Sequence, residues 1–340
     1  MILSVNFPIS NSCIERYGSW EELRAQIYAL GLNGVEAIAD PDDLAADFPA
    51  DLASGFHMTF YPDWLDFWRQ DEKRLLRKFG SWEMIEKIYR GRRPEDLLRQ
   101  FKEDLALGQE TLHTPYMVFH VSDVSLEESY TYRWLHTDYE VLDGAIEFIN
   151  HLLYGVEPTF DFLVENQWWP GFTFTEPEKT EYLLSRIDYP RVGIMLDTGH
   201  LMNANTAIRN QADGIEWILS NIAKHGSLAE RVYGLHFHQS VSGDYVRVNT
   251  KGVPLGFGED YFKDFATCYP HIQQIDRHRA WTNPGCVRIV DAIRPKYLTH
   301  ELSSGPNRPL LSGVKRQMNL LKRGHVLQLD TFLLKTNSSA

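Results

Sequence analysis

Short apolar runs recur along this chain, and most of them end in a histidine, an aspartate or a glutamate. Residues that are far apart in sequence converge in this way when they stand at the carboxyl ends of parallel strands in one closed barrel. The pattern therefore constrains both the fold and the chemistry. The candidate metal ligands at or just past the ends of these runs are His57, His120, Glu165, Asp197, His200, His236, Asp276, His278 and Glu301.

The strand-like runs alternate with longer segments of helical periodicity. Such alternation favours a parallel sheet, and eight strands predict an α/β fold of the (β/α)8 TIM barrel type. We expect a single TIM-barrel domain over residues 1–340, with long insertions after strand three (about 61–93) and strand seven (about 239–275). The expected strands are 2–7, 35–39, 55–60, 116–122, 161–165, 192–197, 232–237 and 297–302.

Composition restricts the class of protein. A hydrophobic content of 43% supplies a large core, and a formal charge of −12 argues against a protein that coats nucleic acid. Cys13, Cys268 and Cys286 have no paired spacing, so neither a disulfide framework nor a thiolate metal site is expected. The first residues lack the features of a secretory signal, and no run reaches the roughly 18 apolar residues of a membrane span. We expect a cytoplasmic protein that has no membrane partner.

Each candidate ligand has a structural alternative when it is taken alone. Glu165 could form a structural ion pair, and Asp197 could cap a helix that carries His200 by chance. A lone His57 or His120 in an apolar run could be a hydrogen-bonded core residue. Six consecutive expected strands, three to eight, deliver such a residue near their carboxyl ends, and this joint placement favours a metal site.

Strand seven carries two histidines in the segment YGLHFHQ. His236 and His238 lie two residues apart, so they project to the same face of the strand. We expect His236 to bind metal and His238 to contact the substrate. The mixture of nitrogen and oxygen donors suits Zn, Mn, Fe or Co.

Five segments together resemble the endonuclease IV and xylose isomerase-like TIM-barrel superfamily, and the resemblance covers nearly the whole chain. The segments are LVEN (163–166), LDTGH (196–200), GLHFH (234–238), DRH (276–278) and HEL (300–302). The sugar isomerases and epimerases of this superfamily use the ligand positions that match Glu165, Asp197, His236 and Glu301. The endonuclease IV branch holds three zinc-like ions with the further positions that match His57, His120, His200, Asp276 and His278. A solvated loop is the alternative for the DRH segment.

Three divalent ions would imply phosphodiester hydrolysis, with Glu165 as a catalytic residue that bridges two ions and orients the attacking water. Trp168, Trp169 and Tyr61 are expected to contact the substrate through broad apolar faces, and their alternative is the packing of one loop on another. The aromatic residues of the first insertion predict either a lid or an extra helical layer: Trp64, Phe67, Trp68 and Trp82.

The segment VEN-x-WWPG is similar to one in the cobamide-remodelling phosphodiesterases. This resemblance implies a small-molecule phosphodiester as substrate, namely the nucleotide loop of a corrinoid. Two alternatives stay open. One is an abasic-site endonuclease that acts on DNA, and the other is a sugar isomerase or epimerase with one metal ion.

Overall fold

Eight parallel strands close into one barrel in which β1 to β8 follow in chain order. This topology confirms the predicted (β/α)8 TIM barrel. The computed structural model describes residues 1–39, 42–303 and 309–324, so the expected domain 1–340 includes three segments outside the described residues. The strands are β1 Ile2–Pro8, β2 Gly34–Ile38, β3 Ala53–His57, β4 Tyr116–His120, β5 Asp161–Glu165, β6 Val192–Asp197, β7 Val232–His236 and β8 Tyr297–His300.

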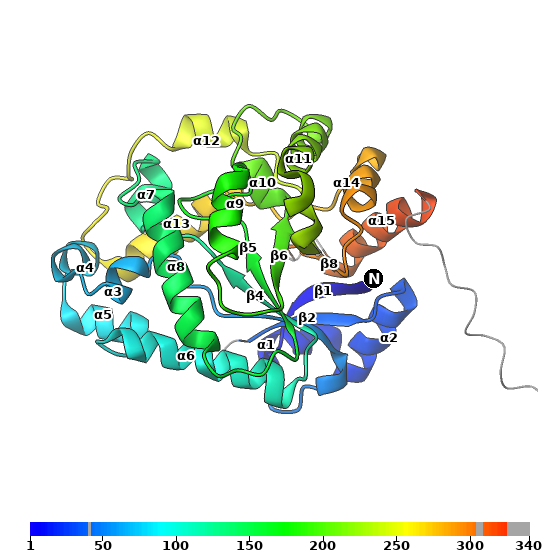
Figure 1. Ribbon diagram of the computed structural model, residues 1–340, viewed down its shortest axis with the longest axis horizontal. Coiled ribbons are helices and arrows are strands. Elements are labelled where there is room, and N and C mark those ends of the chain that lie inside the picture. Colours follow the sequence, from blue (N-terminus) through cyan, green and yellow to red (C-terminus); the bar gives the residue numbers. More distant parts are fainter. Residues whose placement is uncertain (40–41, 304–308, 325–340) are drawn as a thin grey trace, which may run out of the picture.

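Helices form a ring around these strands, as Figure 1 shows. The α-helices are α1 Asn11–Ile14, α2 Trp20–Leu30, α3 Leu65–Trp68, α4 Glu72–Phe79, α5 Trp82–Tyr89, α6 Pro94–Ala106, α7 Leu126–Thr131, α8 Asp138–Leu153, α9 Pro177–Leu184, α10 Thr198–Asn203, α11 Gln211–His225, α12 Gly243–Asn249, α13 Tyr261–Ile275, α14 Val287–Ile293 and α15 Leu310–Arg323. Short 3-10 or π turns are η1 Glu15–Tyr17, η2 Ala50–Leu52, η3 Leu107–Thr111, η4 Gly226–Arg231 and η5 Pro284–Cys286.

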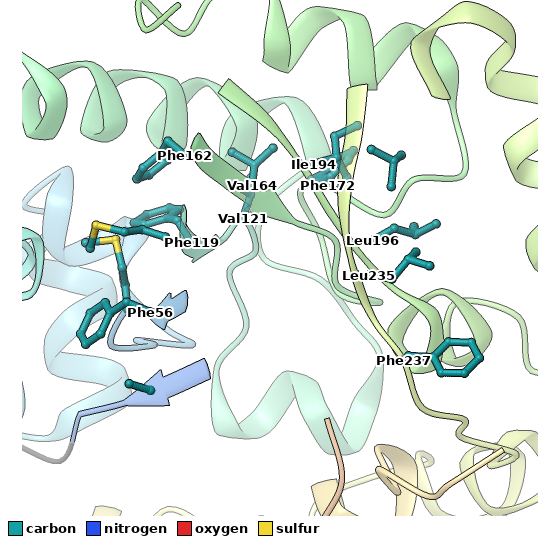
Figure 2. Close-up of a cluster of buried hydrophobic side chains, with 14 of the residues drawn as sticks. Phe56, Phe119, Val121, Phe162, Val164, Phe172, Ile194, Leu196, Leu235 and Phe237 are labelled. Carbon is teal, nitrogen blue, oxygen red and sulfur yellow. The ribbon is translucent and has the colours of Figure 1, made fainter. Parts of the chain in front are cut away.

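Strand periodicity separates the core from the site. Because successive side chains point to opposite faces of a strand, the residue before each candidate ligand faces the helices. Phe119, for example, packs against Phe101 of α6 with ring centroids 5.3 Å apart. Figure 2 shows the outward-facing set in one hydrophobic cluster: Phe56, Phe119, Val164, Leu196 and Leu235. A separate buried cluster contains Val118, Leu163 and Met195, each two residues before a candidate ligand. The ligands therefore stand on an apolar layer.

Five strands end one to three residues earlier than their sequences predicted: β2, β3, β4, β7 and β8. β5 and β6 have the predicted bounds, but β3 ends at His57 and β4 ends at His120. The two strands pair only at Phe56 with Met117 and at His57 with Val118. Of the apolar residues that follow, Phe60 lines the cavity described below, whereas Met58 and Val121 are buried in the main core.

The segment after β3 carries α3, α4 and α5, and the segment after β7 carries α12 and α13. Trp64 and Phe67 are buried in the main core, and Trp68 packs edge-on against Phe148 with centroids 5.0 Å apart. Trp82 is partly buried against the same core. These contacts favour the extra helical layer over the lid. Within the described residues, no helix is long and apolar enough to cross a membrane.

Candidate metal centre

Glu165 occupies the centre of the site at the end of β5, and it is fully buried. Its Oε2 lies 2.9 Å from His120 Nε2 and 3.4 Å from His57 Nε2. The same oxygen lies 3.3 Å from His236 Nδ1, and Oε1 lies 3.0 Å from His200 Nδ1. Burial raises the pKa of Glu165, but His120 and His236 outweigh burial and hold that pKa well below its ordinary value. One carboxylate thus contacts four imidazoles from four different elements.

The candidate ligands fall into three groups whose donor atoms lie within 4.8 Å of one another. Glu165 and His236 belong to two of these groups. The groups are His57, Glu165 and His236; Glu165, Asp197, His236 and Glu301; and His200, His238, Asp276 and His278.

The first group also has His120 beside it. The Nε2 atoms of His57 and His120 are 3.2 Å apart, and both face Glu165. The other ring nitrogen of His57, Nδ1, lies 2.9 Å from the carbonyl oxygen of Met58 and donates its hydrogen there. A neutral imidazole has one N–H, so this contact leaves a lone pair on Nε2. A histidine held in this way is ready to bind a metal ion.

The central group combines three carboxylates with one imidazole. Nδ1 of His236 lies 3.0 Å from Glu301 Oε2 and 3.8 Å from Asp197 Oδ2. Asp197 also caps α10, because its Oδ1 accepts a hydrogen bond from the backbone N–H of His200. The helix-cap alternative and the ligand prediction are therefore compatible for Asp197, since the two carboxylate oxygens have different neighbours.

The third group lies beside the second. His200 Nε2 lies 3.2 Å from Asp276 Oδ2, which also contacts His278 Nε2. His238 stacks on His278 with ring centroids 4.2 Å apart, and its Nε2 lies 2.7 Å from Asp197 Oδ2. Burial, together with the neighbouring His278, lowers the pKa of His238 to about 3, so this imidazole stays neutral at ordinary pH. The fully buried His238, predicted to contact substrate, thus lies among candidate ligands and not on the cavity lining.

The donor set fits divalent cations. In the part of the chain that the structure describes, both oxygens of Glu165, Nδ1 of His236 and Oε2 of Glu301 are buried without a hydrogen-bond partner. Buried polar atoms in proteins ordinarily have such a partner. Nδ1 of His236 lies 3.3 Å from Glu165 Oε2 and 3.0 Å from Glu301 Oε2 without hydrogen-bond geometry. A cation among these three atoms would satisfy them. Imidazole nitrogens and carboxylate oxygens without thiolates suit Zn, Mn, Fe or Co.

A cavity of about 360 Å³ opens above the ligands. His120, His200, Asp276, His278 and Glu301 line its floor. Its walls are largely apolar. Ser125, Ser129 and Gln167 are the polar residues of these walls, and the others are Phe60, Pro62, Val124, Leu126, Trp168, Trp169, Phe265, Cys268, Tyr269 and Ile272, of which the last four belong to α13.

The three predicted aromatic contacts separate in the structure. Trp168 and Trp169 line the large cavity, and the ring of Trp168 lies 5.1 Å from that of His200. Tyr61 instead donates a hydrogen bond to Gln100 and lines a separate small cavity next to Phe101.

The DRH segment, although distant from β7 in sequence, places Asp276 and His278 against His200. Their backbone lies in a loop, and the side chains of His278 and Asp276 are 21% and 10% exposed.

Sequence reasoning missed Glu36 of β2. This carboxylate is fully buried, and its Oε1 lies 2.9 Å from His236 Nε2. A signal was available, because Glu36 interrupts the apolar run GVEAI much as Glu165 ends the run DFLVE. It precedes the end of its strand, and so it lay outside the pattern of ligands at strand ends.

Solved structures share this fold at low sequence identity. A structure described as AsfvAP:AG has 14% identity and a TM-score of 0.51, and the match covers 95% of this chain and 99% of that one. An L-ribulose 3-epimerase has 12% identity and a TM-score of 0.49 over 96% and 95% of the two chains. A sugar phosphate isomerase/epimerase from Parabacteroides distasonis has 12% identity and a TM-score of 0.47 over 94% of each chain. These likenesses concern the fold alone.

No curated protein sequence matches this chain. A family profile does match, over residues 25–277, which include strands β2 to β7 and all of the candidate ligands except His278 and Glu301. This chain therefore belongs to the xylose isomerase-like TIM-barrel family.

Proposed function

We propose that this chain is a metal-dependent phosphodiesterase that hydrolyses a small organic phosphodiester. The observation that carries the proposal is the position of Glu165. Its carboxylate lies between the pair His57 and His120 on one side and the central group on the other, and it also contacts His200 of the third group. A one-metal isomerase needs only the central group, so two further groups of donors favour a multi-metal hydrolase.

The residues divide the work of hydrolysis. Ions held by the three groups would polarise the phosphate and lower the pKa of water. His278 and Glu301 line the cavity, so an ion that they hold is open to the phosphate of a bound substrate. Glu165 lies deeper and orients the attacking water toward phosphorus. The oxygen of water bonds to phosphorus as one P–O ester bond breaks; one proton of that water passes to the leaving oxygen, so the products are an alcohol and a phosphomonoester that carries the remaining hydroxyl.

The cavity walls support a substrate with a flat apolar group. Aromatic faces on β5's loop and on α13 suit stacking on a planar ring system, and about 360 Å³ is within the usual range of small-molecule sites. We propose the nucleotide loop of a cobamide as that substrate, with its lower-ligand nucleoside in the cavity and the corrin ring outside. Duplex DNA fits less well, since the walls are apolar and the chain carries a formal charge of −12.

Incubation of the metal-loaded protein with a cobamide tests the reaction. We expect release of the lower-ligand nucleoside, measured by liquid chromatography with mass spectrometry, together with a corrinoid phosphomonoester. Elemental analysis should give about three metal ions per chain, as three ligand groups require. Protein treated with a chelator is the control. Nicking of a duplex with a tetrahydrofuran lesion would select the endonuclease instead, and about one ion per chain with sugar isomerisation would select the isomerase.

The aromatic wall gives a second prediction. Phe265→Ala should raise KM for the cobamide by roughly 3–10-fold and leave kcat nearly unchanged, because stacking of this size stabilises the bound substrate and the transition state alike. Phe262→Ala is the matched control, since Phe262 is also exposed on α13 but does not line the cavity. Steady-state kinetics of nucleoside release measure both variants. Equal KM values for the two variants would show that α13 does not contact the substrate.

A further inference from the structure

His236 has a neighbour on each side of its ring. Its Nδ1 faces the carboxylates of the central group, with Glu301 Oε2 at 3.0 Å and Glu165 Oε2 at 3.3 Å. Its Nε2 faces the opposite way, toward β2, where Glu36 Oε1 lies at 2.9 Å and Oε2 at 3.2 Å. Glu36 lies on the far side of the imidazole from the candidate metal, so it is outside the ligand groups.

The chemistry of this contact selects one tautomer. A carboxylate only accepts hydrogen bonds, so Nε2 of His236 must carry the hydrogen that it donates to Glu36. A neutral imidazole has a single N–H, and its other nitrogen, Nδ1, then keeps the lone pair that a metal ion requires. We propose that Glu36 is a positioning residue that fixes the tautomer and ring orientation of His236 for the cation in the central group.

Glu36 is itself held in place by hydrogen bonds from two other strands, β4 and β8. Tyr116 Oη and Thr299 Oγ1 both donate to its Oε2, at 2.7 Å and 2.9 Å. Tyr116 can reach it only because β3 has glycine at position 55, where a Cβ would lie 2.1 Å from the tyrosine ring. Three strands therefore contribute to holding one carboxylate under His236. Apolar side chains would fill the same space at a lower cost in folding free energy, and so the arrangement indicates a function.

This inference rests on the metal centre of the proposed function. It assigns no role to the phosphodiester, and its test needs no substrate. A carboxylate that supports a metal-binding histidine typically changes metal affinity by 10–100-fold. The effect should spare the third group, because that group lacks His236 and binds through His200, His238 and His278.

The deciding variant is Glu36→Gln, which keeps size and removes charge. We expect one ion to bind about 10–100-fold more weakly in a competition titration with a chelator, while the ion of the third group keeps its affinity. Glu128→Gln is the matched control, because Glu128 is also buried and caps α7 away from the ligands. NMR spectra of the zinc-loaded, ¹⁵N-histidine-labelled protein should place the His236 proton on Nε2 in the wild type.

The inference would be overturned if Glu36→Gln bound every ion as tightly as the wild type does. It would also be overturned if the His236 proton of the wild type lay on Nδ1. Should Glu36→Gln fail to fold, Tyr116→Phe decides, since it removes one hydrogen bond to Glu36 and leaves His236 untouched. We expect a smaller loss of affinity for the same ion, of about 3-fold, and an unchanged affinity would again overturn the inference. Ions that bind as expected without any phosphodiester hydrolysis would overturn the proposed reaction and leave the role of Glu36 standing.

Discussion

Glu165→Gln should lower kcat/KM for phosphodiester hydrolysis by at least about 10³-fold and reduce the bound metal from about three ions to about one. The amide has the same size but no charge, and it is a poor bridge between two cations. Correct positioning of the attacking water is lost as well, and groups that position or deprotonate a nucleophile contribute about 10²–10⁴-fold. Kinetics of nucleoside release and elemental analysis on the same sample measure the two losses together.

Asp276→Asn is the matched control for this variant. Among the candidate ligands, Asp276 contacts His200 and His278 of the third group and does not contact Glu165. We expect it to remove one ion and leave the two ions that Glu165 bridges. If Glu165→Gln instead kept all three ions and lost only activity, Glu165 would be a catalytic base without a bridging role. If Glu165→Gln kept all of its metal ions and also its activity, the proposed centre would be wrong.

The pH dependence of the stability of the metal-free protein is a second, independent measurement of the role of Glu165. The histidines around it hold the pKa of Glu165 well below its ordinary value. A carboxylate with a lowered pKa contributes stability that is present above the unfolded pKa and is lost as the pH falls through the folded pKa. The metal-free wild type should therefore lose stability in acid over a range where metal-free Glu165→Gln changes less. Thermal unfolding at a series of pH values measures this difference.

The barrel could be predicted because its physical signals are local. In the strands β3 to β7, outward apolar residues alternate with inward ones, and the inward residue at the strand end is a candidate ligand. His120, Glu165, Asp197 and His236 all obey this rule, and the residue before each lies in the outer core. The position of a carboxylate at the end of a buried strand can therefore be predicted from the sequence of that strand alone.

Other features depend on contacts that no local pattern reports. Glu36 meets His236 across the barrel, 200 residues away in sequence. His238 has the same strand-face signal as His236, and only the structure shows it against Asp197 and His278 rather than on the cavity lining. Tyr61 follows β3 closely, but its hydrogen bond to Gln100 turns it into another cavity. Tertiary partners decide these placements, so sequence reasoning could name the residue types but not their roles.

The helices after β3 pack around a buried lysine side chain. Lys78 of α4 has a side chain that is only 8% exposed, and its Nζ lies 2.7 Å from both Asp63 Oδ1 and Asp66 Oδ2. His136 also contacts Asp66, with its Nε2 at 3.0 Å from Oδ1. Burial raises the pKa of Asp66, but His136 and Lys78 outweigh burial and hold it well below its ordinary value. Asp66 is therefore ionised at neutral pH and needs these partners.

Lys78→Met should reduce the free energy of unfolding by about 3–5 kcal/mol, the usual effect of removing one partner from a buried ion pair. Methionine nearly preserves the length and volume of the side chain, so the loss reports the charge. Urea denaturation followed by circular dichroism measures it. Lys73→Met is the matched control, because Lys73 is exposed on the same helix, and we expect a change within about 0.5 kcal/mol.

The pH dependence of this difference separates a charge effect from a packing effect. Burial, only partly offset by Lys78, raises the pKa of Asp63 to about 7. Above that pH the wild type ionises Asp63 beside Lys78, whereas the variant must keep this buried carboxyl protonated at a growing cost in free energy. The destabilisation by Lys78→Met should therefore be larger at about pH 8.5 than at about pH 6. A difference that stays constant across this range would mean that the aliphatic stem of Lys78, and not its ammonium group, holds these helices on the barrel.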